Sequence, residues 1–451
     1  MRSLMKSYNQ ISCLPSNLLN IEMEQCLDEG KSAFEFESEI LLVKSIPDDR
    51  ITEREQRAMG LFLKLQHTPI TQSYPYFEPS SWDQILDHIN YSSDDLIALL
   101  SHYKTNSYGH ILGGILGKCI GCLLGKPVEG WKRSNIVQYM QETNNLPLAK
   151  YLFDGMHHSD YVQYGWQQYK TVSIKGMPED DDINYLLVAF KLIKQFGIHF
   201  KSSDVAMMWL DSLPIYRLCT GERIAYRNFV NGIFPPESAV FCNPYREWIG
   251  AQIRTDLYGY INPGNPVLAM KLAWTDASVS HSKNGIYGGL WIAVILSLIP
   301  VTESIELTLL LSLNFIPNQS RFHKYISDVL SWYRNNLSLK KAINNIHDIF
   351  SEHRIHHWCH VLPNAMIVAI ALLWGKNDFE LSLQIVLTAG FDTDSNGASV
   401  GSILGYAIGA DRISHYWKNV LQNRIESSVL GETNTNISEL AKEVYQFSLV
   451  K

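Results

Sequence analysis

Two ladders of glycine constrain the fold of this chain more than any other feature of its sequence. They consist of Gly113, Gly117, Gly121 and Gly125, and of Gly397, Gly401, Gly405 and Gly409. A spacing of four places each set along one face of a helix. Glycine inside a helix costs about 0.5–1 kcal/mol relative to alanine, so eight would cost roughly 4–8 kcal/mol. Close contact between two helix backbones would offset that cost, so we expect the ladder helices to pack side by side near the centre of the molecule.

The remaining hydrophobic pattern predicts an all-α protein. Segment 183–196 repeats apolar residues at helical spacing and is followed by Gly197, a common stop signal. Segments 366–374 and 381–388 follow the same pattern, whereas the period-two alternation of strands is scarce. The uncharged segment 285–302 approaches the length of a membrane span. It contains a Gly-Gly pair and a proline and lacks a flanking basic cluster, so we expect a buried core helix instead.

Composition excludes several classes of protein. The 451 residues are 46 % hydrophobic and 18 % charged, which suits a large core and not a disordered chain. A net charge of −7 argues against a nucleic-acid partner, which would need a basic surface. Seven cysteines, an odd number, indicate a reducing compartment and not a disulfide framework. The N-terminus lacks the apolar segment of a secretion signal, so we expect a cytoplasmic protein without a membrane partner.

The first hundred residues differ from the rest of the chain. Turn signals are frequent there, and short helical patterns at 51–65 and 82–89 lie between them. Long apolar helical runs begin near Tyr108. We therefore predict an N-terminal helical extension over 1–105 and a main domain over 106–451.

Two acidic motifs each precede a predicted helix, and together they predict a metal site. They are PEDDDIN at 178–184 and GFDTDSNG at 390–397. One such motif would ordinarily cap a helix, but four consecutive acids exceed what one helix start can use. The second motif lies between an apolar run and a glycine ladder, without a nearby Lys or Arg in sequence, and buried carboxylates need a cation or a partner. Oxygen ligands favour Mg²⁺, Mn²⁺ or Ca²⁺ over zinc, and two divalent ions would balance most of the charge of five aspartates and could polarise a substrate.

With these motifs the chain resembles the ADP-ribosylglycohydrolase family, the all-α hydrolases typified by dinitrogenase-reductase activating glycohydrolase. The matching stretches lie at 113–131, 179–185, 248–256, 261–266, 280–289 and 390–410. The resemblance covers about two-thirds of the chain and leaves the first hundred residues outside. It implies a compact orthogonal multi-helix bundle with an extra N-terminal helical segment, and a catalytic domain over 106–451.

The resemblance also implies a set of metal ligands for two Mg²⁺ or Mn²⁺ ions. Carried over position by position, the ligands are Asp180, Asp181, Asp182, Asp392, Asp394 and Ser395. The first motif of the family is usually Thr-Asp-Asp, so Asp180 is a departure that adds negative charge. An alternative register places Glu179 at the threonine position.

Further site residues follow from the same resemblance. The metals would hold the hydroxyls of the distal ribose, and either Glu129 or Asp392 would activate the attacking water. Which of the two is the base stays open. The positions implied to contact the substrate are Glu129, Gly130, Gly250, Ala251, His281, Asn284 and Tyr287.

The resemblance implies a hydrolase that removes ADP-ribose from a modified protein, with arginine as the most common acceptor. The alternatives are a hydrolase of a small ADP-ribose or nucleotide derivative, and a non-catalytic ADP-ribose-binding or structural protein on the same fold. Residues 1–100 could contact a protein partner. The CxxC at 119–122 and the HHWCH at 356–360 look like ligand motifs, but we interpret both as structural parts of helices.

Overall fold

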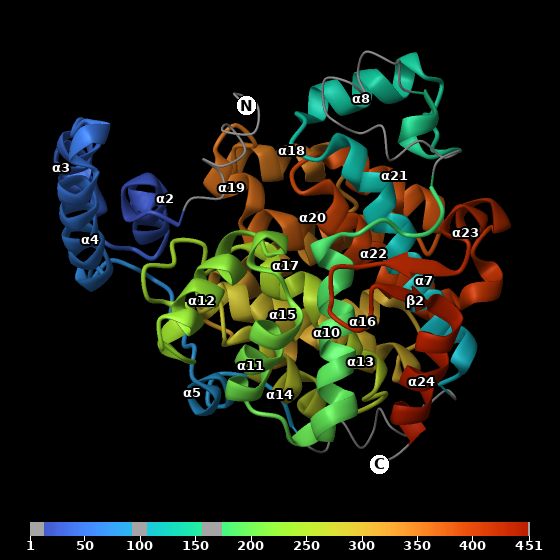
Figure 1. Ribbon diagram of the computed structural model, residues 1–451. Coiled ribbons are helices and arrows are strands. Elements are labelled where there is room, and N and C mark those ends of the chain that lie inside the picture. The colour runs from blue at the N-terminus through green and yellow to red at the C-terminus, as the bar shows by residue number, and fades with distance from the viewer. Residues whose placement is uncertain (1–12, 93–105, 156–173, 450–451) are drawn as a thin grey trace.

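The computed structural model describes residues 13–92, 106–155 and 174–449 (Figure 1). Helices make up nearly all of its regular structure, which confirms the predicted all-α class. Within the described ranges the only strands are β1 (Arg424–Glu426) and β2 (Asn434–Asn436), which form one short antiparallel pair.

The longer helices at the centre are α7 (Tyr108–Gly125), α15 (Lys283–Leu298), α20 (Val361–Trp374) and α22 (Thr393–Ile408). The N-terminal part contributes α2 (Pro15–Asp28), α3 (Glu37–Lys44), α4 (Ile51–His67) and α5 (Trp82–Leu86). The other helices are α8 (Arg133–Glu142), α10 (Asp181–Phe196), α11 (Ser202–Ser212), α12 (Thr220–Val230), α13 (Asp256–Tyr260), α14 (Pro266–Ala277), α16 (Ile305–Ser312), α17 (Arg321–Arg334), α18 (Leu339–Ile349), α19 (Ile355–Cys359), α21 (Phe379–Ala389), α23 (His415–Leu421) and α24 (Ile437–Leu449).

The two glycine ladders pack against each other along α7 and α22, as the spacing predicts. The facing pairs are Gly113 with Gly405, Gly117 with Gly401, and Gly121 with Gly397. A Cβ added to any of these six would collide with the backbone of the facing glycine. One prediction needs correction: Gly409 is not inside the helix but ends it, with a left-handed φ of +83°.

Helices α7 and α22 pack antiparallel, and this direction determines which of their ends meet. Residue numbers increase along α7 in the direction in which they decrease along α22, so Gly125 at the end of α7 faces Thr393 at the start of α22. The segment after the first ladder therefore lies beside the acidic motif that precedes the second.

Among the described residues, two helical segments have the length and apolar composition of membrane spans, 108–128 and 283–301, and the structure buries 89 % and 94 % of their apolar windows. The segment 285–302 is thus a core helix of this molecule, as expected. Lys118, within α7, is fully buried and donates to the Asp256 carboxylate at 2.9 Å and to the Ile253 carbonyl at 2.7 Å. An internal partner therefore satisfies the one cation within the ladder helix.

The N-terminal part is helical, as predicted, and its helices pack around a small apolar cluster that is separate from the main core. Helices α2, α3 and α4 share this cluster with Ile224 and Cys242 of the main body, and in Figure 1 α2 lies between the α3–α4 pair and the main body. The predicted boundary at residue 105 falls outside the described residues and stays a prediction.

Buried ion pairs join this N-terminal part to the main body. Arg246 binds Glu22 and Glu29, each at 2.7 Å. Arg321 binds Glu78 and Glu247, each at 2.8 Å, and all of these side chains are at most 7 % exposed. Because a buried charge without its partner is costly, the main body depends on the extension for its stability.

Candidate metal and catalytic site

Three segments far apart in sequence meet at one lysine ammonium group. Lys126, just after α7, places its Nζ 2.9 Å from Glu129, 2.9 Å from Asp180 and 3.0 Å from Asp394. Asp180 precedes α10, and Asp394 lies in the first turn of α22. The antiparallel glycine pairing brings the end of α7 to this point. The structure therefore gathers both predicted acidic motifs and Glu129 into one acidic cluster, which we define as Glu129, Asp180, Asp181, Asp182, Asp392 and Asp394.

Helix capping explains only part of this arrangement. Asp180 is the N-cap of α10, and its Oδ1 accepts from the backbone N–H of Asp182 at 3.0 Å. Asp392 is the N-cap residue of α22, yet its side chain makes no capping hydrogen bond. Both helices direct their positive N-terminal dipoles at the cluster, which favours anionic side chains there.

Two carboxylate oxygens in the acidic cluster are buried without a hydrogen-bond partner in the described part of the chain. They are Oδ1 of Asp182, a residue that is 1 % exposed, and Oδ1 of Asp394, which is 3 % exposed. The Ser395 hydroxyl donates to the other oxygen of Asp182 at 3.3 Å. Buried polar atoms normally have partners, so these oxygens are candidate ligands of a cation. The donor set is oxygen-rich and fits a hard divalent cation.

The pKa values of the cluster show an excess of negative charge. Burial and the neighbouring Asp394 raise the pKa of Glu129 to about 7, although Lys126 opposes the shift. Burial and Asp180 raise the pKa of Asp181 to about 8. Burial also raises the pKa of Asp394, but Lys126 outweighs that effect and holds it below its usual value. One ammonium therefore does not balance the cluster, whereas a bound cation would.

The alternative register for the first motif finds no support in the geometry. The Glu179 side chain accepts from Asn184 at 2.9 Å, from Ser428 at 3.0 Å and from Arg217 at 3.0 Å. These partners hold Glu179 away from Lys126, while Asp180 contacts it.

Three cysteine thiols border the acidic cluster, and sequence reasoning missed them; one is Cys219, which interacts with Asp181. The Cys122 thiol lies with carboxylate oxygens of Asp180 and Asp182 in a group whose atoms are all within 4.8 Å of one another. The Cys359 thiol lies 3.6 Å from the Asp392 carboxylate. Spacing could have revealed Cys122, because it is four residues before Lys126 and so shares its helix face.

The glycines and the alanine predicted to contact substrate are spread over two segments. Gly130 directly follows Glu129 and is exposed, with a left-handed φ of +76°. Gly250 and Ala251 lie in a buried 3₁₀ helix, Ile249–Arg254, where a Cβ on Gly250 would collide with the Glu222 carboxylate.

The polar side chains predicted to line the substrate cleft have partners elsewhere. The His281 ring bonds the Ser280 hydroxyl at 2.8 Å. Asn284 donates to Glu247 at 2.6 Å, and the Tyr287 hydroxyl donates to the Pro79 carbonyl at 2.5 Å. All three side chains are buried, and the last contact reaches the N-terminal part. Their role in substrate binding stays a prediction.

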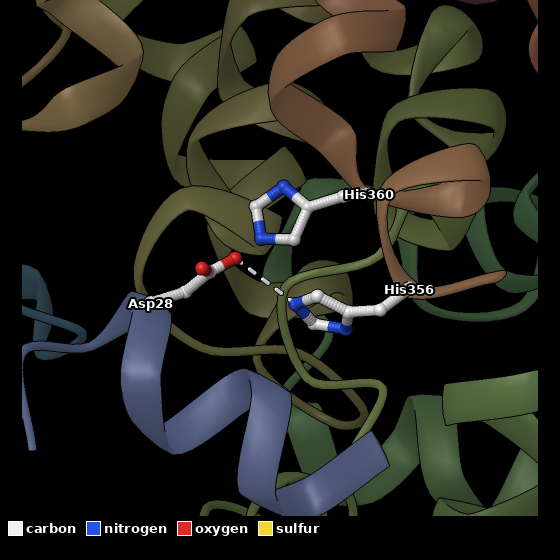
Figure 2. Close-up of side chains that lie close together, drawn as sticks. All are labelled: Asp28, His356 and His360. Carbon is white, nitrogen blue, oxygen red and sulfur yellow. Dashed lines mark hydrogen bonds and ion pairs between the residues drawn. The ribbon is translucent and has the colours of Figure 1, made fainter. Parts of the chain in front are cut away.

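A second group of possible ligands joins the N-terminal part to the main body. Asp28 at the end of α2 lies with His356 and His360, and the three possible ligand atoms are within 4.8 Å of one another. Figure 2 shows both imidazole rings turned toward the carboxylate, with His356 Nε2 at 3.0 Å from it.

Hydrogen bonds on the far side of both rings argue against a metal at this second group. His356 Nδ1 accepts from the Trp248 indole N–H at 3.1 Å, and His360 Nδ1 accepts from the backbone N–H of Leu362 at 3.2 Å. In a neutral ring the proton is then on Nε2, so neither ring offers a lone pair to a cation beside Asp28. His356 Nε2 donates to the Asp28 carboxylate at 3.0 Å, whereas His360 Nε2 has no hydrogen-bond partner among the described residues. The geometry suits a carboxylate held by His356, consistent with the structural interpretation of this motif.

Comparisons with known proteins identify a family for this chain. The model of the family described as ADP-ribosylglycohydrolase matches residues 104–448. A solved structure described as an ADP-ribosylglycohydrolase-related protein complex is similar to this chain, with 18 % identity, a TM-score of 0.42, and coverage of 76 % of this chain and 98 % of that chain. Among curated proteins, none matches.

Proposed function

The chain belongs to the ADP-ribosylglycohydrolase family, and from that premise we propose that it is a metal-dependent hydrolase of the bond between ADP-ribose and a modified protein. The observation that carries the metal dependence is the pair of buried, unpartnered oxygens on Asp182 and Asp394. Family membership supports glycohydrolase activity in general. The arginine linkage and the choice of Mg²⁺ or Mn²⁺ are our proposals, and an ADP-ribosylated protein would be the partner.

We assign one group of residues to cation binding and another residue to proton transfer. Asp182, Asp394 and Ser395 would hold a divalent cation, which when bound would orient and polarise the ribose hydroxyls. Glu129 is the better candidate for the base, because its side chain is 38 % exposed and can meet water, whereas Asp392 is 4 % exposed. Burial and the neighbouring Asp394 raise the pKa of both carboxylates, which favours proton uptake near neutral pH.

The alternative base, Asp392, has a less favourable environment. It is 4 % exposed, and its carboxylate contacts the Cys359 thiol. The attacking water must approach the anomeric carbon as the sugar gains oxocarbenium character. We therefore assign Asp392 to the cation and Glu129 to the water.

The test is release of ADP-ribose from proteins that carry arginine or serine linkages, with Mg²⁺, with Mn²⁺ and with EDTA. We expect release with metal, none with EDTA, and none from Asp394→Asn. Asp211→Asn is the matched control, because Asp211 is an exposed aspartate in another helix and should leave activity unchanged.

Other results would point to the alternatives. Bound metal without release from either linkage would favour a small ADP-ribose derivative as the substrate. Absence of both bound metal and release would favour a non-catalytic ADP-ribose-binding or structural protein.

We also propose that residues 1–100 contact a protein partner. Three large apolar side chains support this proposal: Phe34, Leu41 and Leu42, in and just before α3, are 64–69 % exposed. Alanine at all three positions should impair release from a protein substrate and spare a small ADP-ribosyl substrate.

A further inference from the structure

Lys126 is a cation already present in the middle of the acidic cluster. Its Nζ forms ion pairs with Glu129, Asp180 and Asp394, at 2.9, 2.9 and 3.0 Å, and donates a hydrogen bond to Asp394. The position of the ammonium is therefore defined by all three carboxylates. Asp180 and Asp394 come from the two different acidic motifs, so Lys126 bridges them as a shared metal ion would.

A divalent ion cannot occupy the position between the two motifs that the Lys126 ammonium occupies. Mg²⁺ needs its oxygen ligands at about 2.0–2.1 Å. An ion bound to the Oδ2 atoms of Asp180 and Asp394 on the side that Nζ occupies would lie against Nζ, which is about 3 Å from the same atoms. Two cations at such close range repel each other strongly in a partly buried site, so one must leave.

Three oxygens of the two motifs take no part in the Lys126 contacts. Asp182 Oδ1 and Asp394 Oδ1 are buried without partners within the described residues, and the Ser395 hydroxyl is beside Asp182. Asp182 belongs to the first acidic motif, and Asp394 and Ser395 belong to the second, so these oxygens remain as ligands for a single ion.

We propose that Lys126 takes the place of one of the two cations expected for this site, so that the protein binds a single divalent ion. The inference rests on the proposed metal dependence and refines it. The acidic motifs by themselves, with their five aspartates, predict two ions. The lower number proposed here is due to Lys126, a residue that lies outside both motifs.

The experiment counts Mn²⁺ ions per chain by elemental analysis and by electron paramagnetic resonance, without any assay of turnover. We expect one ion per chain in the wild type, with the spectrum of an isolated Mn²⁺. Lys126→Met removes the charge and keeps the length, so it should bind one more ion and show the spin coupling of a Mn²⁺ pair.

Two further variants keep the result interpretable. Lys126→Arg retains the positive charge and should stay at one ion. Lys132→Met removes an exposed lysine six residues away and should also stay at one. If Lys126→Met does not fold, as judged by thermal unfolding, the wild-type count and the Lys126→Arg count still decide the matter.

The outcomes separate this inference from the proposed function. Two ions in the wild type, or an unchanged count in a folded Lys126→Met, would overturn the inference and leave the metal-dependent hydrolase intact. No ion in the wild type would overturn both. One ion in the wild type and two in Lys126→Met would support both.

Discussion

Replacing Gly117 with alanine tests the idea that the glycine ladders position the site. The added methyl carbon would meet the Gly401 carbonyl oxygen far inside the usual carbon–oxygen contact of about 3.3 Å. The obstacle is backbone, which cannot rotate aside as a side chain can. Helices α7 and α22 must therefore move apart by roughly an ångström.

The expected effect is a net loss of stability. Overpacking a well-packed contact costs about 1–3 kcal/mol, and a rigid neighbour places this case at the upper end. The better helix propensity of alanine returns about 1 kcal/mol. We therefore expect a net destabilisation of about 2 kcal/mol, measured as a lower urea midpoint with an unchanged slope.

Gly60→Ala is the matched control. Gly60 is inside α4 and exposed, and an added Cβ there has nothing within 4 Å. That variant should gain up to about 1 kcal/mol from helix propensity alone. If Gly117→Ala were as stable as the wild type while Gly60→Ala showed its gain, close backbone packing could not be the reason for the ladder.

Three further predictions concern the buried charges and the site. Glu78→Ala should cost about 3 kcal/mol and lower the melting temperature, because buried Arg321 loses a partner; an unchanged melting temperature would contradict the proposed joint between the two parts. The pKa of Asp28 is lowered because the hydrogen bond and charge of His356 outweigh the effect of burial. The ionised Asp28 therefore stabilises the folded state at pH values above its unfolded pKa of about 3.9, and this stabilisation is lost as the pH falls through the lower pKa of the folded state. Asp28→Asn should therefore flatten the loss of melting temperature below about pH 4, and a wild-type profile in that variant would count against this account. Ser395→Ala should weaken Mn²⁺ binding by about tenfold or more in calorimetry, because its hydroxyl contacts Asp182, whereas equal affinity would remove Ser395 from the site.

Much of the fold could be predicted because helix periodicity and glycine spacing are local signals. A repeat of four indicates one helix face, and the cost of helical glycine demands a close neighbour, so the pairing of the ladders followed from sequence. The end of α22 was predicted less well: Gly409 continues the spacing but adopts the left-handed conformation that ends a helix. Spacing by itself cannot distinguish a packed glycine from a terminating one.

The chemistry of the acidic motifs was also readable, but their partners were not. The second motif has no Lys or Arg nearby in sequence, and yet Lys126 contacts Asp394 across 268 positions. The thiols of Cys122 and Cys359 border the acidic cluster for the same reason. Pairing over such separations depends on which helix ends meet.

By itself, the sequence determined that this protein is all-α and that two glycine-faced helices pack together, and it predicted that two acidic motifs bind a cation. These follow from backbone propensity and from the cost of burying charge, which act locally. Only the tertiary structure decided that the ladders run antiparallel, and thus that Lys126 reaches both motifs. It also decided that the N-terminal part is joined to the main body by buried ion pairs, because an ion pair stabilises the protein only where the fold brings both charges together and excludes water.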